Sequence, residues 1–204
     1  QALGVVPDWR GQGIAETLKW AQRERTLAQE LPLITWTYDP LEAANAHLNL
    51  HKLHAIARTY WRDVYGSDFG QLNAGLPTDR LLVEWWVKGP RSNPTYEDEL
   101  EWWEAAPVFG IAGQGVDCWI ARADLALADE LIQLEIPADL QRLKTANLEL
   151  ALDWRLKVRR AFEAYFNRGY LATDFISVFE GETRRNRYIL QKSSPALLAA
   201  IGLV

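Results

Sequence analysis

The sequence predicts a mixed α/β protein, of the α+β kind, in which helices flank a mixed sheet and the C-terminal part adds further helix and strand. Two observations lead to this class. Runs rich in β-branched and aromatic residues alternate along the chain with longer stretches of helical periodicity. The 204 residues, 49% of them hydrophobic and 24% charged, form a normal globular mixture with enough chain for a sizeable core.

The first elements are predicted to be a strand, a turn, a helix and a second strand. The apolar run 3–6 ends at a proline and is typical of the end of a buried strand. Gly11 and Gly13 allow a tight turn, and the periodicity after them predicts a helix that stops before Pro32. The β-forming run 33–37 predicts the next strand. Together these elements predict a βαβ unit with a parallel pair of strands.

The next part of the chain predicts one helix and one strong strand. A helix is expected over 41–60, and the run 81–87 is apolar enough for a buried strand. Glycine and prolines over 89–94 end this strand. The acidic stretch 95–106 is expected to form a surface helix or loop.

A second block starts near residue 116 and places a long helix between strands. The patterns predict strands over 117–122 and 131–136, a helix over 147–167 capped by Gly169, a long strand over 170–179 and a partner strand over 187–191. The chain therefore divides into a core over 1–88, a linker or surface segment over 89–115, and a C-terminal αβ block over 116–204 that packs on the core.

Charge and composition exclude several classes of function. The formal net charge of −5 provides no overall basic face, so no nucleic-acid partner is expected. No apolar stretch is long enough to span a bilayer and no signal peptide opens the chain, which predicts a cytoplasmic protein with no membrane partner. The single cysteine, Cys118, excludes an internal disulfide and is expected to be a small buried core residue.

The turn over 10–15 carries the clearest chemistry. Backbone N–H groups at a turn that leads into a helix form an anion site, and the helix dipole adds roughly half a positive charge there. Gly11 and Gly13 let a phosphate approach the backbone without a Cβ clash, and Arg10 can add a charge-assisted hydrogen bond. A Rossmann fingerprint needs a small residue where Glu16 stands, and a Walker loop needs a Gly-Lys-Ser/Thr sequence that is absent.

The run of strand, proline, Arg-Gly-x-Gly-Ile-Ala and helix resembles the GNAT superfamily of acyl-CoA-dependent N-acetyltransferases. The family motif, Gln/Arg-x-x-Gly-x-Gly/Ala, is matched by Arg10, Gly13 and Ala15. The resemblance implies a partly splayed sheet whose gap holds the acyl thioester, and acetyl-CoA or another acyl-CoA as co-substrate. It assigns the pantetheine arm to Leu3, Val5 and Val6, and the CoA pyrophosphate to Arg10, Gly11, Gln12, Gly13, Ile14 and Ala15.

The resemblance continues downstream of the motif. Asn45 and Lys52 match an asparagine and a lysine that the family often has in the next helix, and they join the expected CoA site. Leu50 stands where a tyrosine often acts as the general acid. Longer stretches, among them 72–86 and 136–139, are similar to a bacterial group of GNAT-like proteins of unassigned substrate. The family usually has several strands and helices before the motif, which begins here almost at residue 1.

Acylation of an amine needs a group that takes a proton from the nitrogen. Glu84, inside an apolar strand, and Asp39, after the second strand, are the candidates, and Asp79 with Arg80 is another option. Burial would raise the pKa of the Glu84 carboxyl. A salt-bridged or solvent-facing glutamate is the alternative for Glu84. His47, His51 and His54 fall on one helical face, but a helix surface or pocket lining is preferred there and no metal is expected.

Four aromatic residues are candidates to line an apolar acceptor pocket, with core packing as the alternative. They are Trp36, Tyr38, Trp85 and Trp86.

The expected function is transfer of an acetyl or acyl group from acyl-CoA to the primary amine of a small molecule or amino acid. The protein would position the reactants and stabilise the oxyanion with a backbone N–H near Val5 or Val6. The alternatives are a non-catalytic acyl-CoA-binding or sensing module and a structural partner subunit. A homodimer is compatible with each of them.

Overall fold

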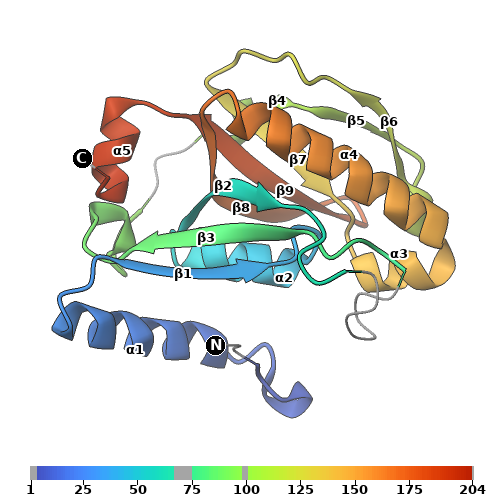
Figure 1. The fold of residues 1–204 in the computed structure, drawn as a ribbon. Helices are drawn as coiled ribbons and strands as arrows, with labels where there is room; N and C mark the ends of the chain where they lie inside the picture. Colours follow the sequence, from blue (N-terminus) through green and yellow to red (C-terminus); the bar gives the residue numbers. More distant parts are fainter. Residues whose placement is uncertain (1–3, 67–74, 98–100, 204) are drawn as a thin grey trace.

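The computed structural model describes residues 4–66, 75–97 and 101–203, and its centre is a seven-stranded sheet (Figure 1). In order across the sheet its strands are β1 (Leu33–Tyr38), β3 (Arg80–Trp86), β2 (Ile56–Trp61), β8 (Tyr170–Glu180), β9 (Thr183–Lys192), β7 (Leu131–Ile136) and β4 (Ala106–Pro107). Neighbouring strands are antiparallel, except that β4 runs parallel to β7. A separate antiparallel pair consists of β5 (Phe109–Ala112) and β6 (Trp119–Ala123). The predicted mixed α/β class is confirmed.

Helices flank this sheet. They are α1 (Ile14–Ala28), α2 (Ala43–Ala46), the π-helix η2 (His47–Lys52), α3 (Leu140–Ala146), α4 (Leu148–Phe166) and α5 (Pro195–Ile201), with short 3₁₀ helices η1 (Pro7–Trp9), η4 (Pro90–Ser92), η5 (Trp102–Glu104) and η6 (Gly115–Asp117). Side-chain caps determine where α3 and α4 begin. The side chain of Asp139 accepts a hydrogen bond from the N–H of Arg142, and that of Asn147 accepts one from the N–H of Leu150.

The two faces of the sheet carry different cores. On β2, Ala57 packs in the main core, whereas its neighbour Ile56 packs with α5. On β8, Ala172 likewise packs in the main core, and its neighbour Leu171 packs with α5. Successive strand residues point to opposite faces, so α5 covers the face opposite to the main core. The bridge pair Ala57 with Ala172 joins β2 to β8, and the strands of the N-terminal and C-terminal blocks thus share one sheet.

A buried carboxylate connects the start of β3 to α4. Asp79 lies directly before β3, and its side chain is fully buried. Arg159 donates to both carboxylate oxygens at 2.8 Å, the Tyr60 hydroxyl donates at 2.6 Å, and the N–H of Asp63 donates at 3.0 Å. A charge in the interior is tolerated only when it is paired and hydrogen-bonded in this way.

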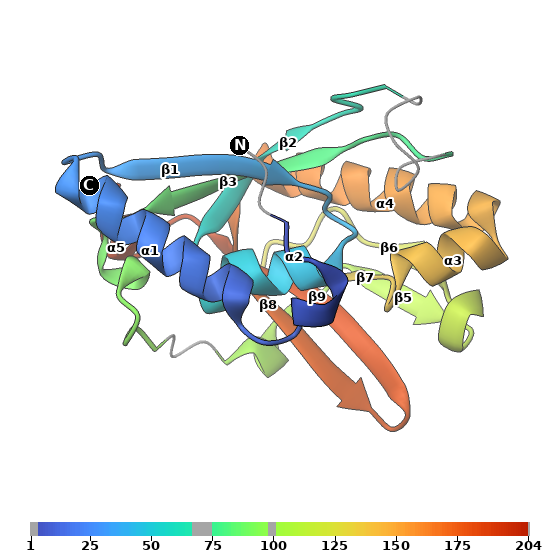
Figure 2. The same cartoon turned by 90° about the horizontal axis from the view of Figure 1, so that it is seen from below.

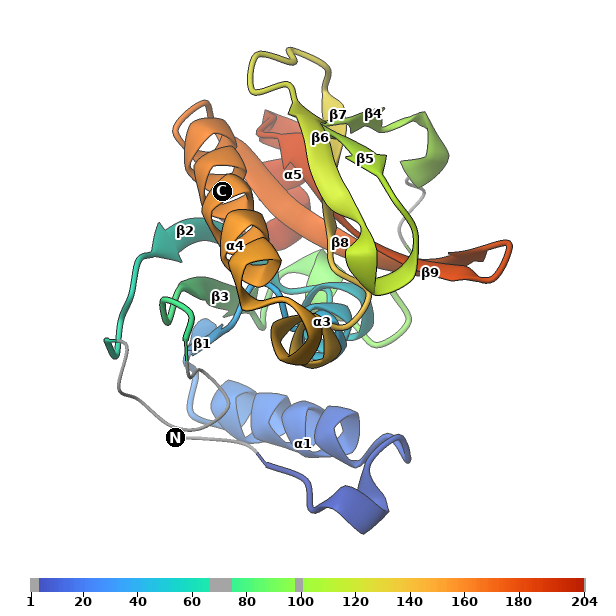
Figure 3. The same ribbon diagram turned by 90° about the vertical axis from the view of Figure 1, so that its right-hand side faces the viewer.

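Two parts of the chain lie at the periphery. Helix α1 is at the opposite end of the molecule from the β5–β6 pair (Figure 3), and the β8–β9 hairpin projects from the body (Figure 2). Near the hairpin tip, Phe179 is 72% exposed. In α1, Trp20 packs edge-on against Trp85 at 5.2 Å between ring centroids, and Lys19 is buried.

Several predicted elements are confirmed by the structure. The expected strands over 81–87 and 131–136 correspond to β3 and β7, and the expected helix over 147–167 corresponds to α4. The helix and strand over 14–38 form α1 and β1, and the hairpin over 170–191 forms β8 and β9. Gly169 follows α4 with a φ of +82°, as its expected capping role requires.

The predicted helix over 41–60 is wrong in its second half. Helical backbone ends at Lys52, His54 adopts a φ of +51°, and β2 occupies Ile56–Trp61. β2 lies between β3 and β8, where both of its edges are hydrogen-bonded to other strands. β2 is buried only at Ile56 and Ala57, and its pairing within the sheet outweighs the helical spacing of the sequence.

The stretch 95–106, expected to be a surface helix or loop, includes η5 and the start of β4. Residues 98–100 of this stretch lie outside the part of the chain that the structure describes.

Candidate functional site

The glycine turn precedes α1 and adopts the conformation that its glycines predict. Gly11 and Gly13 have φ values of +74° and +75°, which are strained for any residue with a Cβ. Among the described residues, no atom lies within 4 Å of a Cβ built at either glycine. Arg10 and Gln12 are exposed beside them. The backbone of the turn is therefore open to a ligand.

The first turn of α1 directs its N–H groups towards this open space. Gly13 is the N-cap, and the first bond within the helix runs from the N–H of Thr17 to the carbonyl of Gly13 at 3.0 Å. The N–H groups of Ile14, Ala15 and Glu16 therefore precede the first helical hydrogen bond. N–H groups in this arrangement, at the positive end of the helix dipole, suit an anion.

The segment before the turn is not the strand that was predicted. Residues 4–6 have no strand structure, Val6 is 63% exposed, and Leu3 lies outside the described residues. The carbonyl of Val6 accepts from the N–H of Trp9, and that of Val5 accepts from Nε of Arg10, both at 3.0 Å. These carbonyls serve a local turn, and β1 pairs with antiparallel β3. The predicted parallel βαβ pair is therefore wrong.

Asn45 and Lys52, the two residues expected to extend the CoA site, are exposed on α2 and at the end of η2. Within the described ranges neither side chain is bonded to the turn. Leu50, which stands where the family often has its acid, is completely buried in the main core.

The four aromatic residues expected around the acceptor do not line one pocket. Trp36, Tyr38 and Trp85 belong to the main core, with the rings of Trp36 and Trp85 edge-on at 6.2 Å. Trp86 packs with α5 on the opposite face. The Lys19 ammonium lies 3.4 Å from the ring centre of Trp36, and burial lowers the pKa of Lys19 to about 8.

Glu84 is buried in β3 and bound to neighbouring donors. Arg58 donates to its two carboxylate oxygens at 2.9 and 3.0 Å, and the indole N–H of Trp86 adds a bond of 3.1 Å. A bidentate arginine pair of this kind is a strong structural contact. Glu84 is thus the salt-bridged glutamate that was the alternative to a catalytic base.

Asp39, at the end of β1, has a similar role in the interior. Arg155 of α4 donates to it at 2.6 Å, the N–H of Leu41 donates at 2.8 Å, and Arg80 lies 3.6 Å away. Burial opposes the charge of Arg155, but the neighbouring Asp39 carboxylate raises the pKa of Arg155 above its ordinary value. The pair connects β1 to α4.

His51 and Asp174 form a close pair that the sequence did not connect. His51 Nδ1 lies 2.9 Å from Asp174 Oδ1, although 123 positions separate the residues. The ring of His47 stacks on that of His51 at 4.7 Å. The spacing of these histidines was visible in the sequence, but their carboxylate partner was not. Among the residues with described positions, no three His, Cys, Asp or Glu side chains gather as a metal site requires.

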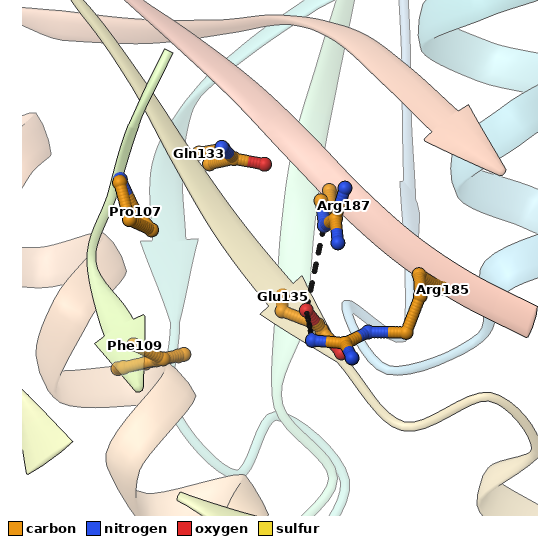
Figure 4. Close-up of a pocket in the computed structure, with 6 residues that line it drawn as sticks. All are labelled: Pro107, Phe109, Gln133, Glu135, Arg185 and Arg187. Atoms are coloured by element: carbon orange, nitrogen blue, oxygen red, sulfur yellow. Dashed lines mark hydrogen bonds and ion pairs between the residues drawn. The ribbon is translucent and has the colours of Figure 1, made fainter. Parts of the chain in front are cut away.

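A cavity of about 220 Å³ lies elsewhere, beside β4, β7 and β9 (Figure 4). Its lining consists of Pro107, Phe109, Gln133, Glu135, Arg185 and Arg187. The Glu135 carboxylate lies 2.6 Å from Arg185 Nε and 3.4 Å from Arg187 Nε. The Glu180 carboxylate also pairs with Arg185 and Arg187, so two carboxylates balance the two arginines and we assign no ligand to the cavity.

Comparisons of the chain with models of protein families, with curated proteins and with solved structures found no match. The resemblance to the GNAT superfamily stays a prediction from the motif. Across the described ranges, no helix combines the length and the apolar character needed to cross a bilayer.

Proposed function

We propose that the chain is an N-acyltransferase that moves an acetyl or acyl group from acyl-CoA to the primary amine of a small molecule or amino acid. The observation that carries this proposal is the pair of left-handed glycines, Gly11 and Gly13, directly before the 15-residue helix α1. Together with the motif around them, they support a site for the CoA pyrophosphate.

Space and charge around the turn support this assignment. A phosphate can approach the backbone because a Cβ at Gly11 or Gly13 would meet no atom of the part of the chain that the structure describes within 4 Å. The N–H groups at the start of α1, which precede the first hydrogen bond of the helix, favour an anion, and exposed Arg10 supplies a cation next to them.

The position of β1 at the edge of the sheet supports it as the binding site of the pantetheine arm of CoA. β1 is an edge strand, with β3 on one side and no strand of the described residues on the other. Such an edge offers backbone N–H and C=O groups to an extended, amide-containing chain. The pantetheine arm of CoA has this chemistry.

One observation favours the second candidate, a non-catalytic acyl-CoA-binding module. Glu84 and Asp39, the two expected bases, are both held in ion pairs with arginines. Neither is free to accept a proton from an amine. A binding module needs no such group, whereas an enzyme must use another base or a pre-bound neutral amine.

Calorimetric titration with CoA tests the turn. We expect Gly13→Glu to weaken binding about 100-fold or more, roughly 2.7 kcal/mol, because its carboxylate would occupy the pyrophosphate position. Gly181→Glu is the matched control, since Gly181 at the β8–β9 turn has a φ of +62° and equally open surroundings. It should bind CoA like the unaltered chain.

The results of CoA titration and of a thiol-release assay distinguish the two candidate functions. Undiminished CoA affinity in Gly13→Glu would refute the turn as the pyrophosphate site. If the unaltered chain does not bind CoA, both candidates fail. Thiol release from acetyl-CoA with a panel of amines then distinguishes the enzyme from the module, because only the enzyme releases thiol in an amine-dependent manner.

A further inference from the structure

The His51–Asp174 pair joins a buried carboxylate to a half-exposed imidazole. The side chain of Asp174, on β8, is 12% exposed, and that of His51, on η2, is 42% exposed. The bond between them runs from Nδ1 to Oδ1 at 2.9 Å. The imidazole therefore extends from a fixed carboxylate in the sheet to the solvent.

Both residues stand on irregular backbone. The register between β8 and β9 shifts between Ala172 and Asp174, which leaves Thr173 as an extra residue in the strand. The N–H of Phe175 donates to Asp174 Oδ1 at 2.7 Å and holds the carboxylate in place. η2, which packs against β8, is a π-helix. Bulges and π-turns both redirect side chains and occur often at functional sites.

The pair determines where the imidazole can accept a proton. An ionised carboxylate only accepts hydrogen bonds, so the ring hydrogen lies on Nδ1 of His51 and a lone pair remains on Nε2. Within residues 4–66, 75–97 and 101–203, no group hydrogen-bonds to that Nε2. Burial lowers the pKa of His47, whose ring stacks on that of His51.

We propose that His51 is the general base of the acyl transfer, with Asp174 as the positioning residue that fixes its tautomer; this inference rests on the proposed function. Nε2 of His51 takes a proton from the ammonium group of the acceptor. The neutral amine attacks the thioester carbonyl, the C–N bond forms, and the C–S bond breaks. The CoA thiolate takes up the second proton of the nitrogen, and the imidazolium releases its proton to solvent.

The experiment compares variants of the 204-residue chain in amine-dependent thiol release from acetyl-CoA, alongside CoA titration. His51→Ala should lose about 100-fold or more of the rate with CoA affinity unchanged. Added imidazole should restore part of the loss in this variant only, after subtraction of the reaction without protein. His51→Gln should lose a similar amount and also bind CoA. His54→Asn is the matched control, because asparagine tolerates the left-handed backbone of His54, and its rate should equal that of the unaltered chain.

Asp174→Asn tests the positioning role separately. Its rate should fall less than that of His51→Ala, and ¹⁵N spectra of the imidazoles should show His51 changing from one tautomer to a mixture. If both His51 variants keep their rate within about threefold, the base assignment is overturned while the acyltransferase stands. If the unaltered chain binds CoA but acetylates no amine, the acyltransferase and the base role are overturned together.

Discussion

The glycine turn and the buried centre of this protein are built in opposite ways. The turn consists of the exposed residues 10–13 followed by the partly buried Ile14 and Ala15, and α1 behind it packs Lys19 and Trp20 against the sheet. The centre depends on contacts between distant residues. Arg159 reaches Asp79 across 80 positions, and Arg155 reaches Asp39 across 116.

With the turn as the proposed CoA site, binding and folding depend on different residues. A side chain added at the turn meets open space and disturbs only the local backbone, whereas a side chain lost from the centre leaves a buried charge without its partner. We therefore expect substitutions in the turn to change CoA affinity more than stability, and substitutions in the centre to change stability first.

The largest effect is expected for Asp79→Ala. Arg159, the Tyr60 hydroxyl and the N–H of Asp63 would all lose their shared acceptor, at a cost of about 3–5 kcal/mol in the free energy of unfolding. Unfolding in urea, followed by circular dichroism, measures this loss. Glu130→Ala, at an exposed ion pair with Lys192, is the control and should lie within about 0.5 kcal/mol of the unaltered chain. A loss below about 1 kcal/mol for Asp79→Ala would contradict the role of the buried network.

The same substitution, glycine to alanine, tests the difference between the turn and the centre at two positions. At Gly89, a Cβ would lie 1.9 Å from the backbone carbonyl of Ile201, so Gly89→Ala must displace α5 and should cost about 2–3 kcal/mol. At Gly13, a Cβ has space but the left-handed backbone is strained, so Gly13→Ala should cost only about 1 kcal/mol. Each variant is the control for the other in the same urea experiment. Equal losses would show that the turn is as tightly constrained as the α5 contact.

Local features of the fold could be predicted from the sequence. Gly11 and Gly13 predict the turn because their backbone preference acts at the residues themselves. α4 was found because its apolar face repeats over many turns. The predicted helix over 41–60 was wrong in its second half because β2 is stabilised by pairing with β3 and β8. No pattern within the segment itself indicates these partners.

In the candidate site, too, local features could be predicted from the sequence and contacts between distant residues could not. The glycine turn over 10–15, on which the proposed phosphate site rests, could be predicted from the sequence. The roles of Glu84 and Asp39 depend on Arg58 and Arg155, which only the fold brings near. The His51–Asp174 pair needs a register shift in β8 and a π-helix, and neither has a sequence signal as strong as a glycine turn.

A smaller effect than at Asp79 or Gly89 is expected at Lys19, through which α1 contacts the sheet. Burial lowers its pKa to about 8, so the folded protein binds fewer protons than the unfolded chain between about pH 8 and 10.5. The stability of the unaltered chain therefore rises with pH across this window. At pH 7 the buried charge is a cost, which the contact with Trp36 offsets only in part.

Lys19→Met removes that charge and keeps an apolar side chain of similar length. We expect it to stabilise the protein by about 1–2 kcal/mol at pH 7, and the gain to fall by more than half at pH 10, where Lys19 is already neutral in the folded state. Urea unfolding at both pH values measures the difference, with exposed Lys52→Met as the control that should change neither. A destabilised variant at pH 7 would mean that the ammonium–indole contact outweighs the cost of burial. If CoA affinity also changed, the docking of α1 and the binding turn would be coupled, and the separation of binding from folding would not hold.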